Sequence, residues 1–132
     1  MSYYAELIFG ARLRKNTPIR VITNLRWLIE GDDTFGVEDM LYVPHNNPLN
    51  SSSGNFGVSH PLSKIWWDEE KQQTEVSVRS CINNIHSDIE LFLAWIEPYI
   101  EKGAGVYHFY AIVTGEDENP RLYFKFPPDV YQ

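Results

Sequence analysis

Residues 3–13 restrict the fold of this chain more than any other segment, because their apolar side chains recur at every second position. Such alternation is typical of a β-strand with one buried face, since successive side chains of a strand point to opposite sides. One face of this predicted strand carries Tyr3, Ala5, Leu7, Phe9, Ala11 and Leu13. Other elements are needed to cover that face.

Two segments with helical spacing can supply the cover. Thr17 and Pro18 are typical of an N-cap and a first helical position, and Gly31 provides a stop. Ser87 and Glu90 have the spacing of a capping box at the start of a second helix. The predicted apolar stripes are Pro18, Val21, Ile22, Leu25, Leu28 and Ile29, then Ile89, Phe92, Leu93, Ile96 and Ile100. Pro98 predicts a kink or an early end of the second helix.

Two β-hairpins complete the pattern. Residues 63–82 predict one with its turn near Glu69–Gln72, and residues 106–126 predict another across the polar turn GEDENP. The resulting order, β-α-loop-β-β-α-β-β, is typical of a ferredoxin-like α+β fold with an added C-terminal strand. In that fold, one antiparallel sheet has two helices on one face. We predict a single domain over residues 1–132, with an irregular insertion at about 32–62.

The adjacent tryptophans Trp66 and Trp67 depend on the register of the first hairpin, because they must point to opposite faces. If Ile65 and Trp67 face the helices, Lys64 and Trp66 lie on the free face of the sheet. The opposite register would bury Lys64 and Asp68, which is costly. The sequence therefore predicts Trp67 as a core residue and Trp66 as a surface residue.

Charge and composition exclude several classes of protein. The 132 residues include 11 basic and 18 acidic side chains, and the resulting net charge of −7 opposes a broad grip on a phosphate backbone. Cys81, the single cysteine, excludes an intrachain disulfide and a zinc site built on several thiolates. No stretch approaches the ~18 apolar residues that span a bilayer, and a signal-peptide pattern is missing. We expect a cytoplasmic protein that does not associate with membranes.

An aromatic sheet face is the remaining route to nucleic-acid binding, because exposed rings can stack on bases. The free face is predicted to carry Tyr4, Glu6, Arg12, Glu75, Ser77, Arg79, His108, Tyr110, Tyr123 and Lys125. Acidic residues alternate with basic ones in this set, and the aromatic and basic pattern of RNA-recognition strands is missing. The sequence therefore argues against nucleic acid as the partner.

Motifs for catalysis and metal binding are absent. The chain lacks G-x-S-x-G, C-x-x-C and H-E-x-x-H, and we predict no catalytic residue, metal or cofactor. His45 and His60 share the long loop with several acidic residues, which leaves open a hydrolase of unknown type. The SSSGNFG stretch, residues 51–57, leaves open a small ligand such as a nucleotide, bound between the 44–61 loop and the sheet.

Large apolar side chains on the outer faces of the helices are the sharper functional signal. Trp27 lies opposite the buried stripe of the first helix, and Leu91 and Trp95 lie four residues apart beside that of the second. Exposing them costs about 25 cal/mol per Å² of apolar area. Either the long loop or the seam between the helices covers them, or they bind a protein partner or a second copy. The predicted binding residues are Trp27, Trp66, Arg79, Leu91, Trp95, Tyr110 and His60.

Three segments resemble a known group of proteins. The order E-x-F-L-x-W-I-x-P-Y-I at residues 90–100, together with residues 3–29 and the NPRLYF ending, is similar to an uncharacterised family of small bacterial and phage (prophage) proteins. The resemblance covers nearly the whole chain except the 32–62 loop. It implies the fold described above and a phage or bacterial setting. The family has no established activity, so the resemblance assigns no role to any residue.

These observations favour a binding protein over an enzyme. We expect a small acidic protein of phage or bacterial origin that acts by protein–protein interaction, as an inhibitor, an anti-defence protein or an immunity protein does. The small-ligand binder and the hydrolase remain the alternatives.

Overall fold

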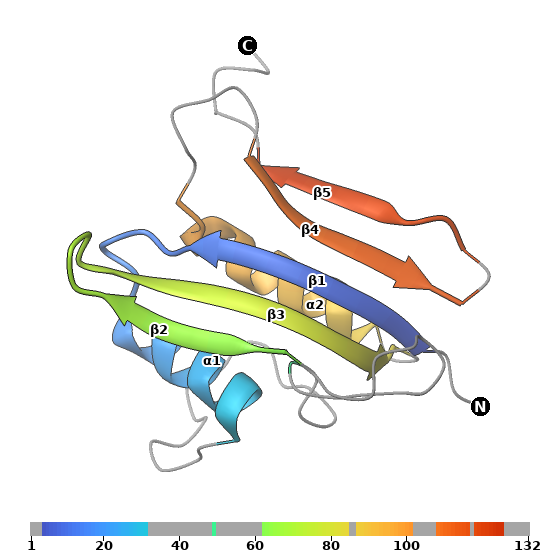
Figure 1. The fold of residues 1–132 in the computed structure, drawn as a ribbon, viewed down its shortest axis with the longest axis horizontal. Coiled ribbons are helices and arrows are strands. Elements are labelled where there is room, and N and C mark those ends of the chain that lie inside the picture. Colours follow the sequence, from blue (N-terminus) through green and yellow to red (C-terminus); the bar gives the residue numbers. More distant parts are fainter. Residues whose placement is uncertain are drawn as a thin grey trace.

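The computed structural model describes residues 4–31, 49, 62–84, 87–101, 108–116 and 118–125. Within them the chain forms five strands, two α-helices and one 3-10 helix (Figure 1). The elements are β1 (Tyr4–Arg12), α1 (Ile19–Glu30), β2 (Lys64–Asp68), β3 (Gln73–Asn83), α2 (Asp88–Ile96), η3 (Glu97–Tyr99), β4 (His108–Gly115) and β5 (Arg121–Lys125). Of the insertion predicted at about 32–62, the described residues include only Leu49 and Leu62.

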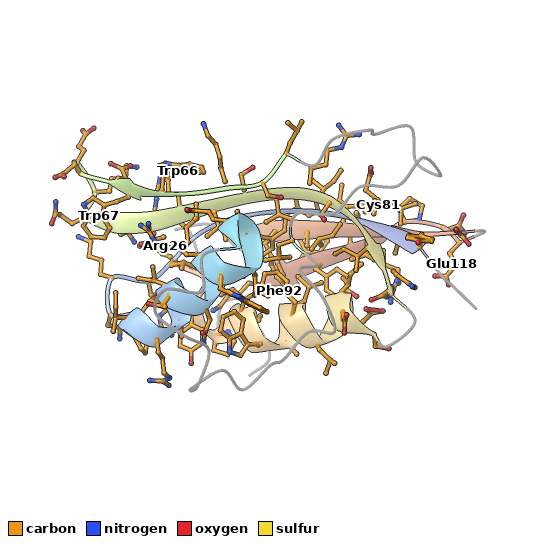
Figure 2. All side chains as sticks on the ribbon, turned by 90° about the horizontal axis from the view of Figure 1, so that it is seen from below. Arg26, Trp66, Trp67, Cys81, Phe92 and Glu118 are labelled. Carbon is orange, nitrogen blue, oxygen red and sulfur yellow. The ribbon has the colours of Figure 1, made fainter. Side chains whose placement is uncertain are left out.

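The strands form one sheet in the order β2-β3-β1-β4-β5, and every neighbouring pair is antiparallel. Figure 2 shows α1 and α2 on the same face of this sheet, so neither described helix lies on the other face, called the free face below. The α+β class predicted from the sequence is confirmed, with a five-stranded antiparallel sheet and two helices.

The core lies between the sheet and the two helices. Phe9 of β1 meets Phe92 of α2 edge-to-face, with ring centroids 5.4 Å apart. Leu49 is fully buried in the same cluster. The predicted alternation of β1 and both helical stripes are confirmed at most positions, because the buried residues include Ala5, Leu7, Phe9, Leu13, Val21, Leu25, Leu28, Ile29, Ile89, Phe92, Leu93, Ile96 and Ile100. Ala11, Pro18 and Ile22 are only partly buried, and Tyr3 lies outside the described residues.

The helix ends agree with the sequence in part. Gly31 ends α1 in the left-handed conformation at φ 73°, and its N–H donates to the Trp27 carbonyl. Pro98 lies in η3, so α2 ends early, as predicted. The N-cap of α1 is Pro18 and not the predicted Thr17, whereas Ser87 is the N-cap residue of α2 as predicted. Neither residue makes a side-chain cap hydrogen bond, so the predicted capping box is wrong. Asn84 performs that task for α2, where its Oδ1 accepts from the Ile89 N–H at 2.8 Å.

The first hairpin has the predicted register. Ile65 lies opposite Val76 and Trp66 lies opposite Glu75, so Trp67 faces the helices and Trp66 faces away from them. The prediction that Trp67 is a core residue is nevertheless wrong, because it is 46% exposed, compared with 40% for Trp66. Since β2 is an edge strand, a side chain can face the helices there and still project past the core.

The second hairpin presents the opposite faces from those predicted. Phe109 lies opposite Phe124 and Ala111 lies opposite Tyr123, so Tyr110 is an extra residue at a register shift in β4. Tyr110 is buried against Phe9, with ring centroids 6.2 Å apart. The predicted positions of Tyr110, Tyr123 and Lys125 on the free face are wrong, since these side chains lie on the helix side.

Candidate interaction surface

A group of apolar side chains lies on the free face, over β1, β4 and β5. Ile8 is opposite Ile112, and Ile112 is in turn opposite Leu122, so the three form a row across the sheet. Beside this row the rings of Phe109 and Phe124 pack at 5.5 Å. We call Ile8, Phe109, Ile112, Leu122 and Phe124 the free-face cluster.

The side chains of the free-face cluster are unusually exposed for large apolar residues. Ile8, Phe109, Leu122 and Phe124 are between 40% and 56% exposed. Together they leave on the order of 300 Å² of apolar surface in water, which is the size of the largest patch on a typical monomer. Patches of that size are often binding sites, because covering them removes apolar area from water.

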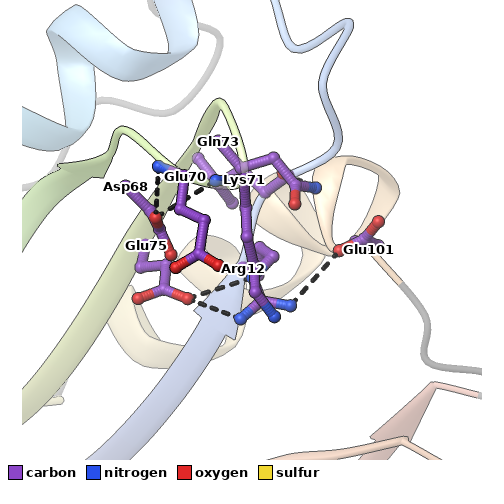
Figure 3. Close-up of polar contacts among 8 residues, drawn as sticks. Arg12, Asp68, Glu70, Lys71, Gln73, Glu75 and Glu101 are labelled. Atoms are coloured by element: carbon purple, nitrogen blue, oxygen red, sulfur yellow. Dashed lines mark hydrogen bonds and ion pairs between the residues drawn. The ribbon is translucent and has the colours of Figure 1, made fainter.

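The other half of the free face, over β1, β2 and β3, is mainly charged, with Trp66 as its large apolar side chain. Arg12 donates from Nε and Nη2 to Glu75 Oε1, at 3.0 and 2.8 Å, and its Nη1 lies 4.0 Å from Glu101 (Figure 3). The hydrogen bond with Glu75 is the main reason why the pKa of Arg12 is raised. Arg79 Nε lies 3.6 Å from Glu6 Oε2. The charges of this half are therefore compensated in pairs across neighbouring strands.

The predicted binding residues do not lie together. Trp27 and Trp95 are half-buried against the core, and the Trp95 ring contacts Phe92 at 6.2 Å. Leu91 is exposed on α2, on the opposite side of the sheet from Trp66 and Arg79. Of the three residues predicted to bind through the outer faces of the helices, Trp27, Leu91 and Trp95, only Leu91 is exposed.

Tyr110 and His60 are not available as described surface residues. Tyr110 is only 7% exposed, and burial raises the pKa of its hydroxyl. His60 lies outside the described residues, as do His45 and the 51–57 stretch. Trp66 and Arg79 are on the free face as predicted, with Trp66 opposite the Glu75 that pairs with Arg12.

Among the described residues, no group of three or more His, Cys, Asp or Glu side chains could hold a metal ion. Cys81 is buried, as expected of a small packing residue. None of the described helices has the length and apolar character that crossing a membrane requires. The charged groups Arg12 and Glu75, and Arg79 and Glu6, form ion pairs on the free face.

Sequence reasoning missed most of the free-face cluster. Leu122 and Phe124 alternate with Arg121, Tyr123 and Lys125, and the charged and hydroxylated residues were the natural choice for the solvent side. The bulge at Tyr110 has no signal in the sequence, since no glycine or proline marks it. One signal was available. If Tyr123 is assigned to the core, strand alternation places Leu122 and Phe124 on the free face.

No protein-family model matches the chain, and no curated protein or solved structure matches it. The resemblance to small bacterial and phage proteins therefore stays a prediction. The function has to be argued from the surface itself.

Proposed function

We propose that this chain is a non-enzymatic binding protein of phage or bacterial origin, which docks on a protein partner through the free-face cluster. The observation that carries this proposal is an apolar patch on a sheet face that no described helix covers. Interfaces have apolar centres rich in aromatic side chains, surrounded by polar residues. Phe109 and Phe124 supply such a centre, and the ion pairs of Arg12 and Arg79 supply a polar border.

Charge indicates the kind of partner. The chain carries a net charge of −7, and Glu116 and Glu118 lie in the turn that adjoins the cluster between β4 and β5. A cationic protein surface with an apolar centre would match both properties, and long-range attraction would speed the encounter. An inhibitor, an anti-defence protein or an immunity protein that occupies a basic host or competing protein would act in this way.

The proposal includes the finer fold and the setting. We propose a single ferredoxin-like domain, in which β2, β3, β1 and β4 form the four-stranded sheet and β5 is the added strand that changes the observed order. A cytoplasmic location belongs to the same proposal. The nucleotide binder and the hydrolase gain no support from the described residues, because they depend on His45, His60 and residues 51–57.

A pair of leucines gives a matched test. Leu122 in the free-face cluster is 56% exposed and Leu91 on α2 is 51% exposed, so the same substitution removes nearly the same apolar area from two faces. The tagged full chain is used to capture proteins from a host lysate, and bound proteins are identified by mass spectrometry. We expect Leu122→Ser to lose a cationic partner that Leu91→Ser retains, and added salt to weaken the capture.

The reverse outcome would assign binding to the outer face of α2 and overturn the proposal. Retention of every captured protein by both variants would also overturn it. Melting temperatures of both variants serve as the control for folding, because neither leucine is buried.

A further inference from the structure

The open edge of β2 is a second surface, separate from the free-face cluster. β2 is an edge strand, and among the described residues its backbone pairs only with β3. Edge strands are templates for pairing with another chain unless charges, a bulge or proline interrupt them. Here the interior is Ile65, Trp66 and Trp67, and charges occur only at the ends, as Lys64 and Asp68. Among the described residues, nothing protects the centre of this edge.

The direction of the backbone groups follows from a contact beside β2. Leu62 and Arg79 each donate a backbone N–H to the carbonyl of the other, at 2.9 and 3.0 Å. Bonded and non-bonded pairs alternate along an antiparallel ladder. The backbone groups that point toward β3 are therefore those of Lys64, Trp66 and Asp68. Those that point to the open side are Ser63, Ile65 and Trp67.

We propose that two copies of this chain associate by antiparallel pairing of their β2 strands, with Trp66 of one copy opposite Trp66 of the other. In this register Ile65 meets Trp67 of the second copy, and both have outward-pointing backbone groups that can bond. Trp66 then occupies a non-bonded position, where opposite side chains approach most closely and aromatic pairs contribute most. The result is one continuous ten-stranded sheet, since each copy supplies five strands.

Charge selects this register over its neighbours. Lys64 and Asp68 are two residues on either side of Trp66, so each faces the opposite charge of the second copy. Asp68 Oδ1 accepts from the N–H groups of Glu70 and Lys71, which fixes the carboxylate at the end of the strand. Centring the pair on Ile65 would set Lys64 against Trp66, and centring it on Trp67 would set Trp66 against Asp68. Only the Trp66-centred register pairs both charges.

Neither described helix covers the Trp66 ring, because α1 and α2 lie on the other face of the sheet. Figure 2 shows α1 below the sheet, while Trp66 lies on the side away from the helices. Both indole rings are exposed, at 40% and 46%, although they are among the largest apolar side chains of the protein. Because the free-face cluster lies over β1, β4 and β5, pairing through β2 leaves it open in both copies. The dimer and the proposed partner can therefore be tested separately.

A charge swap tests the register. Lys64→Asp places like charges opposite each other at both ends of the strand pair, and we expect it to raise the dimer Kd at least about tenfold. Adding Asp68→Lys to the same chain restores opposite charges and should recover most of the affinity. Lys71→Asp, in the turn of the same hairpin, makes the same change of charge away from the paired positions and is the control. Analytical ultracentrifugation of the full chain measures each Kd.

A disulfide trap provides a second measurement that does not depend on Asp68 or its turn. Under mild oxidation Trp66→Cys should give a covalent dimer, because only the proposed register sets this position against itself. Ile19→Cys, at a 75% exposed site on α1, should give no covalent dimer, because the β2 pairing does not bring this position close to its copy. A wild-type chain that remains monomeric at every concentration overturns the proposal. So does a dimer that is indifferent to Lys64→Asp but is lost with Leu122→Ser, since that dimer uses the free-face cluster.

Discussion

The two edge strands, β2 and β5, have similar patterns of charged and apolar residues, but their charged residues lie on opposite faces of the sheet. In β2, Lys-Ile-Trp-Trp-Asp, the charged ends lie on the free face and Ile65 faces the helices. In β5, Arg-Leu-Tyr-Phe-Lys, the charged ends and Tyr123 turn toward the helices, and Leu122 and Phe124 face away. Arg121 Nη2 lies 3.3 Å from Glu90 Oε1, and Lys125 Nζ donates to the carbonyls of Glu97 and Ile100 at 2.8 Å each.

The difference shows that available partners decide which face of an edge strand turns inward. The end of α2 and η3 presents the carbonyls of Glu97, which also accepts from the Ile100 N–H at 3.2 Å, and of Ile100, and a lysine there donates to both and matches the helix dipole. Lys64 of β2 lies on the free face instead, and it takes part in none of the ion pairs among the described residues. Charged residues therefore turn inward at β5 and outward at β2. As a consequence, Leu122 and Phe124 are left on the surface.

The largest effect on stability is expected at Tyr110, the extra residue at the register shift between β4 and β5. Tyr110→Ala removes a buried ring that packs against Phe9 and Tyr123, and should lower the free energy of unfolding by about 3 kcal/mol. Trp66→Ala removes a larger but exposed ring and should cost less than about 1 kcal/mol. Urea denaturation of both variants measures the difference. Equal losses would show that Tyr110 is not a core residue.

A smaller effect is expected from the inward lysine. Lys125→Met keeps the aliphatic stem and leaves the Glu97 and Ile100 carbonyls without this donor, which should cost about 2 kcal/mol. Lys64→Met, at the exposed end of β2, should stay within about 0.5 kcal/mol of the wild-type chain. Thermal or urea unfolding compares them. If the two substitutions cost the same, the carbonyl contacts of Lys125 do not explain the orientation of β5.

Much of the fold could be predicted because periodicity reports which residues share a face. The alternation of β1 and the stripes of α1 and α2 identified the buried residues, and the cost of burying Lys64 gave the correct register for the first hairpin. Each of these inferences requires only that apolar side chains turn toward the core and charged ones toward water. The sequence contains enough information for such local choices.

The candidate surface could not be predicted for a related reason. Periodicity leaves open which face turns inward when one face carries charges and the other carries rings, as in β5. The choice depends on Glu90 and on the carbonyls at the end of α2, which are 20 or more residues away along the chain. The prediction of the side chain that caps α2 failed for a similar reason. Asn84 Oδ1, and not the Ser87 hydroxyl, accepts from a helix N–H, and the S-x-x-E pattern does not include Asn84.

The smallest effect on stability is expected for the pair of exposed rings on the free face of β4 and β5. Phe109 and Phe124 lie opposite each other with centroids 5.5 Å apart, so a double-mutant cycle with Phe109→Ala and Phe124→Ala should give a coupling of about 0.5 kcal/mol. Trp66 and Glu75, opposite each other at the β2 edge, are the matched pair and should show almost no coupling. A Phe109–Phe124 coupling no larger than that of Trp66 and Glu75 would mean that the rings do not stabilise each other. The free-face cluster would then be two separate exposed rings rather than a preformed surface, and its case as a docking site would rest on Ile8, Ile112 and Leu122 alone.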